Sequence, residues 1–77
     1  MTDSKKLRKL IKENGTTITF LAQKLGLSRQ GLTLKIDNVN DFTAPEIVSL
    51  CETLRVTSLK ERDSIFFAKK VDENETD

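Results

Sequence analysis

The side chains best suited to chemistry lie in residues 28–37. Arg29 and Gln30 follow Ser28, a residue type that often caps the N-terminus of a helix. A guanidinium can pair with a guanine edge or a phosphate, and a carboxamide can make two hydrogen bonds with an adenine. Thr33 lies one helical turn further on, where its hydroxyl could meet a base or the backbone. These residue types at this spacing indicate recognition of base pairs in DNA.

Other residues near this segment are candidates for supporting contacts. Thr17, Gln23 and Ser28 are candidates for phosphate contacts at helix N-termini, whose free amides attract anions. Leu34 would lie on the same face of the helix and could cover a thymine methyl group. The predicted DNA-contacting residues are Thr17, Gln23, Lys24, Ser28, Arg29, Gln30, Thr33, Leu34, Lys35, Asn38 and Asn40.

The sequence contains few of the groups that an enzyme active site needs. It has no histidine, no glycine-rich phosphate loop and one cysteine, Cys51, which falls in an apolar helical repeat and is predicted to be a small buried hydrophobe. A thiol without a base is a poor nucleophile, and a lone cysteine cannot hold zinc. We therefore expect no catalytic residues, no metal and no cofactor. The carboxylates predicted to be solvated helix residues and caps include Glu46, Glu52, Glu61 and Asp63.

The net charge of +1 looks low for a nucleic-acid-binding protein, but the charges are unevenly distributed. Residues 1–35 carry eight basic and two acidic side chains, whereas residues 36–77 carry five basic and ten acidic ones. Such a chain can present a basic face to DNA. The alternative is that the lysines and arginines of the first helix are only its solvated surface.

Length and composition predict one small helical domain. The 77 residues are 36% hydrophobic and 32% charged, without tryptophan or tyrosine. A core of this size is marginal alone, so a homodimer is expected. No stretch approaches the roughly 18 apolar residues of a membrane helix, no secretory signal is evident, and we expect a cytoplasmic protein. The domain is predicted over residues 1–71, followed by an acidic flexible tail at residues 72–77.

Apolar spacing and capping residues predict five helices. The first is expected over residues 4–14, with Ser4 as N-cap and Gly15 ending it. The second is expected over residues 18–25, between a cap at Thr16 or Thr17 and Gly26. The third is expected from Ser28 to near Asp37, with Asn38 closing the helix in the left-handed conformation. The three residues 26–28 then form a short turn that begins with glycine, as a helix-turn-helix requires.

Two capping boxes predict the remaining helices. Thr43 and Glu46 bracket the start of the fourth helix, and Ser58 and Glu61 the start of the fifth. In the fourth helix Ile47, Leu50, Cys51 and Leu54 recur at helical spacing, and the apolar residues of the fifth are Leu59, Ile65, Phe66 and Phe67. Because three consecutive bulky residues cannot all face one core, Ile65, Phe66 and Phe67 are predicted to form a protein interface. The alternative is that Phe66 completes the core and Phe67 lies partly exposed.

The residues around the predicted turn carry a family resemblance. Ala22 lies four residues before Gly26 and allows a close helix crossing, and the surrounding apolar positions are Leu21, Leu25, Leu27 and Leu32. Over residues 5–67 the chain resembles the phage Cro and CI repressor-like domains. The resemblance implies an all-α, five-helix, lambda-repressor-like DNA-binding domain with its helix-turn-helix at helices 2 and 3. It also implies that the partner is double-stranded operator DNA.

Further residues are similar to a narrower group. The run Leu27-Ser28-Arg29-Gln30-Gly31-Leu32 is followed by Lys35, Asp41-Phe42, Glu46-Ile47 and Ile65-Phe66-Phe67-Ala68. This pattern looks like small Cro-like phage and prophage proteins of Gram-positive bacteria. The resemblance implies a transcriptional regulator that acts in the choice between lysis and lysogeny.

Some residues depart from a polar reading face. Gly31 costs a helix about 0.5–1 kcal/mol relative to alanine, and Asp37 places a negative charge near the phosphates. Phe20 and Leu34 are apolar residues on predicted outer faces. They suggest an alternative function, in which the protein is an antirepressor or modulator that binds a phage repressor protein through Phe20 and Leu34.

Overall fold

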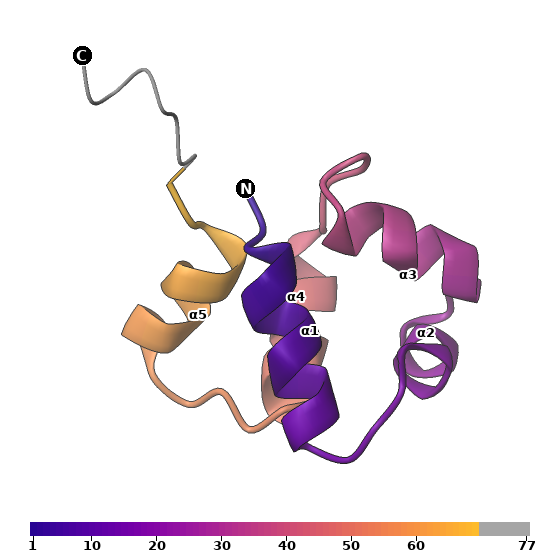
Figure 1. Cartoon of the computed structure of the whole chain (residues 1–77), viewed down its shortest axis with the longest axis horizontal. Coiled ribbons are helices and arrows are strands. Elements are labelled where there is room, and N and C mark those ends of the chain that lie inside the picture. Colours follow the sequence, from indigo (N-terminus) through magenta and orange to yellow (C-terminus); the bar gives the residue numbers. More distant parts are fainter. Residues whose placement is uncertain (70–77) are drawn as a thin grey trace.

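The computed structural model describes residues 1–69 and contains five helices and no strand within them (Figure 1). The helices are α1 (Ser4–Glu13), α2 (Ile18–Leu25), α3 (Arg29–Ile36), α4 (Ala44–Thr53) and α5 (Leu59–Phe66). The prediction of an all-α chain with five helices is confirmed. The predicted acidic tail and the last two residues of the predicted domain lie outside the described residues.

Local hydrogen bonds explain where most helices begin. The side chains of Thr17, Ser28 and Thr43 each accept a hydrogen bond from the backbone amide three residues later, as predicted. Glu46 completes the capping box at α4 by accepting from the Thr43 amide. At α5 only Ser58 caps, so the second capping box is half formed.

The start of α1 differs from the prediction. Asp3 is the N-cap, and its carboxylate accepts from the Lys6 amide. Ser4 is the first helical residue, and its hydroxyl instead donates to the carbonyl of Ile36, at the end of α3. A partner distant in the sequence therefore decides the role of this serine.

All five helices contribute to one core. The most deeply buried large side chains are Leu7, Leu21, Leu32, Ile36, Leu50 and Ile65. Phe66 is also buried and meets Phe42 edge to face, with ring centroids 5.4 Å apart. The prediction that Ile65 and Phe66 form an intermolecular interface is therefore wrong, because the monomer buries both. Phe67 remains 56% exposed, as the alternative expected.

The turn between α2 and α3 positions the third helix. Gly26 has a left-handed backbone with φ of 73°, which closes α2 without steric strain. The Leu27 amide then donates to the Ala22 carbonyl at 2.8 Å. Ala22 itself is 1% exposed, so its small side chain lies inside the contact with the neighbouring helices. In Figure 1, α2 is seen end-on beneath α3, so the two helices cross.

Candidate nucleic-acid interface

The first turn of α3 is open to solvent. Arg29 and Gln30 are exposed at the N-terminal end of this helix, directly after the capping residue Ser28. Thr33 is half-buried and its hydroxyl donates to the Arg29 carbonyl at 3.0 Å. Since a hydroxyl also accepts, Thr33 keeps an acceptor for a further partner. The two predicted base-reading side chains are therefore accessible and lie at the end of the helix that geometry favours for groove entry.

Beside this end of α3 lies an open groove of about 480 Å³ between α1, α2 and α3. Cations from two helices reach it: Arg8 and Lys12 from α1, and Arg29 from α3. The N-terminus of α2, capped by Thr17, opens into the same groove. Its other lining residues are Ile11, Thr16, Ile18 and Thr19. The guanidinium of Arg8 is paired with Asp37 at 3.0 Å, so the groove offers two further cations, Lys12 and Arg29. Together with several hydroxyls and a helix N-terminus, these suit a phosphate of a nucleic-acid backbone.

A scan against protein-family models matches residues 6–61 to the Cro/C1-type HTH DNA-binding domain. The chain belongs to the Cro/C1-type helix-turn-helix family. Its lambda-repressor-like fold and its function as a DNA-binding transcriptional regulator follow from this membership. The family is non-enzymatic. Searches of curated proteins and of solved structures found no significant match.

The groove of this Cro/C1-type domain contains residues that the sequence prediction missed. Thr17 and Arg29 were predicted, whereas Arg8, Lys12 and Thr19 were not. A signal was present, because Arg8 and Lys12 are four residues apart and therefore share a helix face. What the sequence did not show was that this face of α1 turns toward the start of α2.

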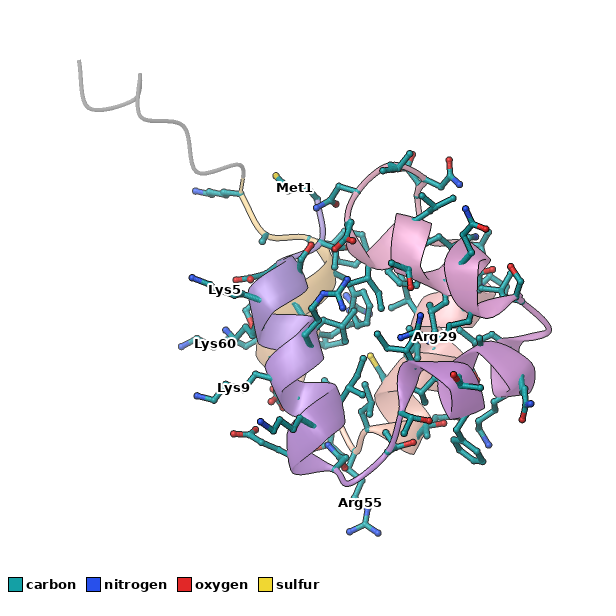
Figure 2. All side chains as sticks on the ribbon, turned by 45° about the vertical axis from the view of Figure 1, so that its right-hand side comes forward. Met1, Lys5, Lys9, Arg29, Arg55 and Lys60 are labelled. Carbon is teal, nitrogen blue, oxygen red and sulfur yellow. The ribbon has the colours of Figure 1, made fainter. Side chains whose placement is uncertain are left out.

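The other lysines of α1 do not join this site. Figure 2 shows Lys5 and Lys9 on the side of the molecule away from Arg29, together with Lys60 of α5. The basic excess of residues 1–35 is thus divided between the groove and a solvated face. The solvated-surface interpretation holds for Lys5 and Lys9, and a DNA-binding face of α1 stays a prediction for Arg8 and Lys12.

Lys35, a predicted DNA contact, has an intramolecular partner. Its ammonium lies 2.7 Å from a carboxylate oxygen of Glu46, and both side chains are 15% exposed. Burial alone would raise the pKa of Glu46, but the hydrogen bonds from Lys35 and the Thr43 amide outweigh it and the pKa is lowered. This ion pair links α3 to α4, so Lys35 helps to hold α3 in place.

Replacing Glu46 with glutamine should lower the free energy of unfolding by about 1–3 kcal/mol at pH 7, because a largely buried ammonium loses its partner. The lowered pKa of Glu46 means that this stabilisation is present above pH 4.5 and is lost as the pH falls further. Urea denaturation at several pH values should therefore show the two proteins converging in acid. Glu52→Gln, at an exposed site on the same helix, is the control and should change little.

Asp37 has a partner that explains its place near the predicted DNA face. Two hydrogen bonds of 3.0 Å join its carboxylate to the guanidinium of Arg8. The side chains are 42% and 44% exposed, so the pair contributes little to stability. Its main effect is electrostatic, because Arg8 neutralises the acid that would otherwise repel a phosphate.

Asn38 and Asn40 were both predicted to contact DNA. The amide of Asn38 is used within the protein, since it accepts from the Thr2 N–H and donates to the Thr2 carbonyl. Asn38 also has the left-handed backbone predicted for it, with φ of 66°. The side chain of Asn40 remains exposed.

The remaining predicted residues are spread over α2 and α3. Gln23 and Lys24 are exposed on α2, as is Phe20, which is 52% exposed. Leu34 is only half-buried in place of the fully exposed position expected from its helical angle. Leu34 therefore offers less apolar surface than Phe20.

Gly31 has a structural reason within α3. A Cβ atom at this position would lie 3.0 Å from the hydroxyl of Ser28, closer than normal packing allows. That hydroxyl accepts the Gly31 amide at 2.9 Å and caps the helix. The absence of a Cβ at Gly31 thus leaves space for the Ser28 hydroxyl to cap α3.

Cys51 packs against the core with its side chain half-buried, and burial raises the pKa of its thiol. The thiolate that a nucleophile requires is therefore disfavoured. Among residues 1–69, no group of three potential metal ligands was found, and no helix there is long and apolar enough to cross a membrane.

Proposed function

We propose that this Cro/C1-type domain binds an operator by placing the N-terminal end of α3 in the major groove. Arg29 and Gln30 then face the base edges, with Thr33 behind them. The groove beside α2 holds a backbone phosphate at Lys12, next to the Arg8 that is paired with Asp37. The observation that carries the proposal is that three cations from two helices meet beside the two helix N-termini of the helix-turn-helix.

The experiment begins with selection of duplexes from a random pool by the purified chain. The binding constant for an enriched duplex is then measured at several salt concentrations. Each neutralised phosphate should contribute roughly −0.9 to the slope of log K against log salt. Failure to enrich any duplex, or an affinity independent of salt, would contradict the proposal.

The biological setting we propose is the lysis–lysogeny switch of a phage or prophage of Gram-positive bacteria, in the host cytoplasm. The run Leu27-Ser28-Arg29-Gln30-Gly31-Leu32, which spans the turn and the start of α3, supports this setting by its resemblance to phage proteins. Binding to the operator region of the phage that encodes the chain would support it. Enrichment only of unrelated host sequences would argue against it.

We also propose that the domain binds its operator as a homodimer, with Phe67 in the interface. Phe67 is 56% exposed and borders a groove of about 280 Å³ that also includes Met1 and Phe42. An exposed aromatic beside a groove of mixed polar and apolar lining is typical of protein contacts.

Phe67→Ser should therefore shift the chain from dimer to monomer in sedimentation equilibrium, by roughly tenfold or more in the dissociation constant. Phe20→Ser is the matched control, because Phe20 is exposed to a similar extent, at 52%, but lies on α2. Equal masses for wild type and Phe67→Ser would contradict an interface at Phe67.

A second candidate function is an antirepressor that binds the phage repressor protein. The exposed ring of Phe20 favours it, since aromatic side chains are enriched among the residues that dominate protein–protein binding. Leu34 would extend the patch, although it is half-buried. If Phe20→Ser and Leu34→Asp each abolish capture of the purified repressor of the same phage while duplex binding persists, this function is supported. Capture unaffected by both changes would refute this interface.

A further inference from the structure

The first four residues, here called the N-terminal clamp, are bonded to the end of the reading helix α3. The backbone of Thr2 makes two hydrogen bonds with the side chain of Asn38, at 2.8 and 2.9 Å. The hydroxyl of Ser4 donates to the carbonyl of Ile36. This carbonyl is one of the last four of α3, which have no partner within the helix. The clamp thus satisfies and holds the C-terminal end of α3.

The same clamp is bonded to the end of α5. The Asp3 amide donates to the Ile65 carbonyl at 2.7 Å, and the Ala68 amide donates to the Met1 carbonyl at 2.9 Å. Between these bonds Thr2 is only 6% exposed. In Figure 1 the start of the chain lies between the end of α5 and the turn that follows α3. The clamp is therefore a hydrogen-bonded bridge from α5 to α3, with Thr2 as its buried residue.

The two ends of α3 are held by different means. Its N-terminal end is set by the short turn from α2, whereas its C-terminal end is followed by the exposed residues 37–41. Asn38 lies there in a left-handed conformation that is uncommon outside glycine, and its amide is fixed by Thr2. Without these bonds the C-terminal end of α3 would keep the buried side chain of Ile36 and the ion pairs of Lys35 and Asp37, of which the second is exposed.

We infer that the N-terminal clamp positions the reading helix for base recognition, with Asn38 and Ser4 as its positioning residues. This inference rests on the proposed function, because it assigns the clamp a role in reading DNA. A tilt of α3 moves Arg29 and Gln30 relative to the bases. The groove beside α2 is also lined by residues of α1 and of the start of α2, which such a tilt does not move. Losing the clamp should therefore reduce selectivity more than overall attraction to DNA.

The test uses the double variant Ser4→Ala with Asn38→Gly. Alanine keeps the helix without the hydroxyl, and glycine accepts φ of 66° without the amide. The control is Ser64→Ala with Arg55→Gly. Ser64 is a helical serine whose hydroxyl donates to the Glu61 carbonyl of its own helix and accepts from the Lys6 ammonium of α1, so neither bond reaches α3. Arg55 is the other non-glycine residue with positive φ among residues 1–69, at 61°.

The first measurement needs no DNA. Amide hydrogen exchange should become about tenfold faster at the C-terminal end of α3 in the clamp variant, since several bonds of modest net value are lost. The amides of α2 should keep their rates. The control should exchange like the wild type throughout α3. Unchanged exchange at the end of α3 in the clamp variant would overturn the inference.

The second measurement compares an enriched duplex with a scrambled one, well below the melting temperature of each variant. The ratio of the two affinities should fall roughly tenfold in the clamp variant, with scrambled binding and its salt dependence retained. Faster amide exchange together with an unchanged ratio of the two affinities would overturn a role of the clamp in base recognition. If the wild type selects no duplex, the proposed function fails, and the exchange measurement alone decides whether the clamp positions α3.

Discussion

Replacing Arg29 with alanine should weaken binding to the enriched duplex by about 10–100-fold, the expected cost of losing a good contact to a base or a desolvated phosphate. Arg29 is exposed at the start of α3 and also lines the groove beside α2. If it pairs with a base, selectivity should relax at one position of the site. If it binds a phosphate, all duplexes should lose affinity and the salt slope should shrink by roughly one.

Lys60→Ala is the control for charge. It removes one positive charge from α5, on the side of the molecule away from Arg29 (Figure 2). Since salt screens exposed charges beyond about 8 Å at physiological ionic strength, the affinity should change less than about twofold. Equal losses in the two variants would mean that net charge, and not the groove and α3, determines binding.

The second large effect concerns the fold. Leu32→Ala should lower the free energy of unfolding by about 2–5 kcal/mol, because this side chain of the reading helix is fully buried and its removal leaves a cavity. For a domain of this size such a loss approaches the whole stability, which is of order 4–12 kcal/mol. Urea denaturation followed by circular dichroism measures it.

Leu59→Ala makes the same change at the start of α5, where the side chain is 68% exposed. Its effect should stay within about 0.5 kcal/mol. If Leu32→Ala destabilised the protein as little as Leu59→Ala, Leu32 would not support the core.

Much of the fold could be predicted because its signals are local. Thr17, Ser28 and Thr43 each cap a helix through an amide three residues away, so the sequence nearby contains both partners. Gly26 marks the turn for the same reason, since its φ of 73° suits glycine. The exposure of Arg29 and Gln30 followed from helical periodicity once Leu32 was placed inside.

The partners of several polar residues could not be predicted. Lys35 and Glu46 are 11 residues apart in the sequence, and Asn38 and Thr2 are 36 apart. Nothing local distinguishes a lysine that meets a phosphate from one that meets a carboxylate. Two predicted DNA contacts therefore proved to be bonded within the protein, where they hold α3.

The sequence by itself determined the five helices, the glycine turn and the helix that presents Arg29 and Gln30, because capping and periodicity act within a few residues. Only the tertiary structure decided that Phe66 belongs to the core, where Phe42 meets its ring. It also decided which cations of α1 join the groove beside α2 and α3. The physical reason is that burial and ion pairing depend on which surfaces meet, and packing between distant segments determines that.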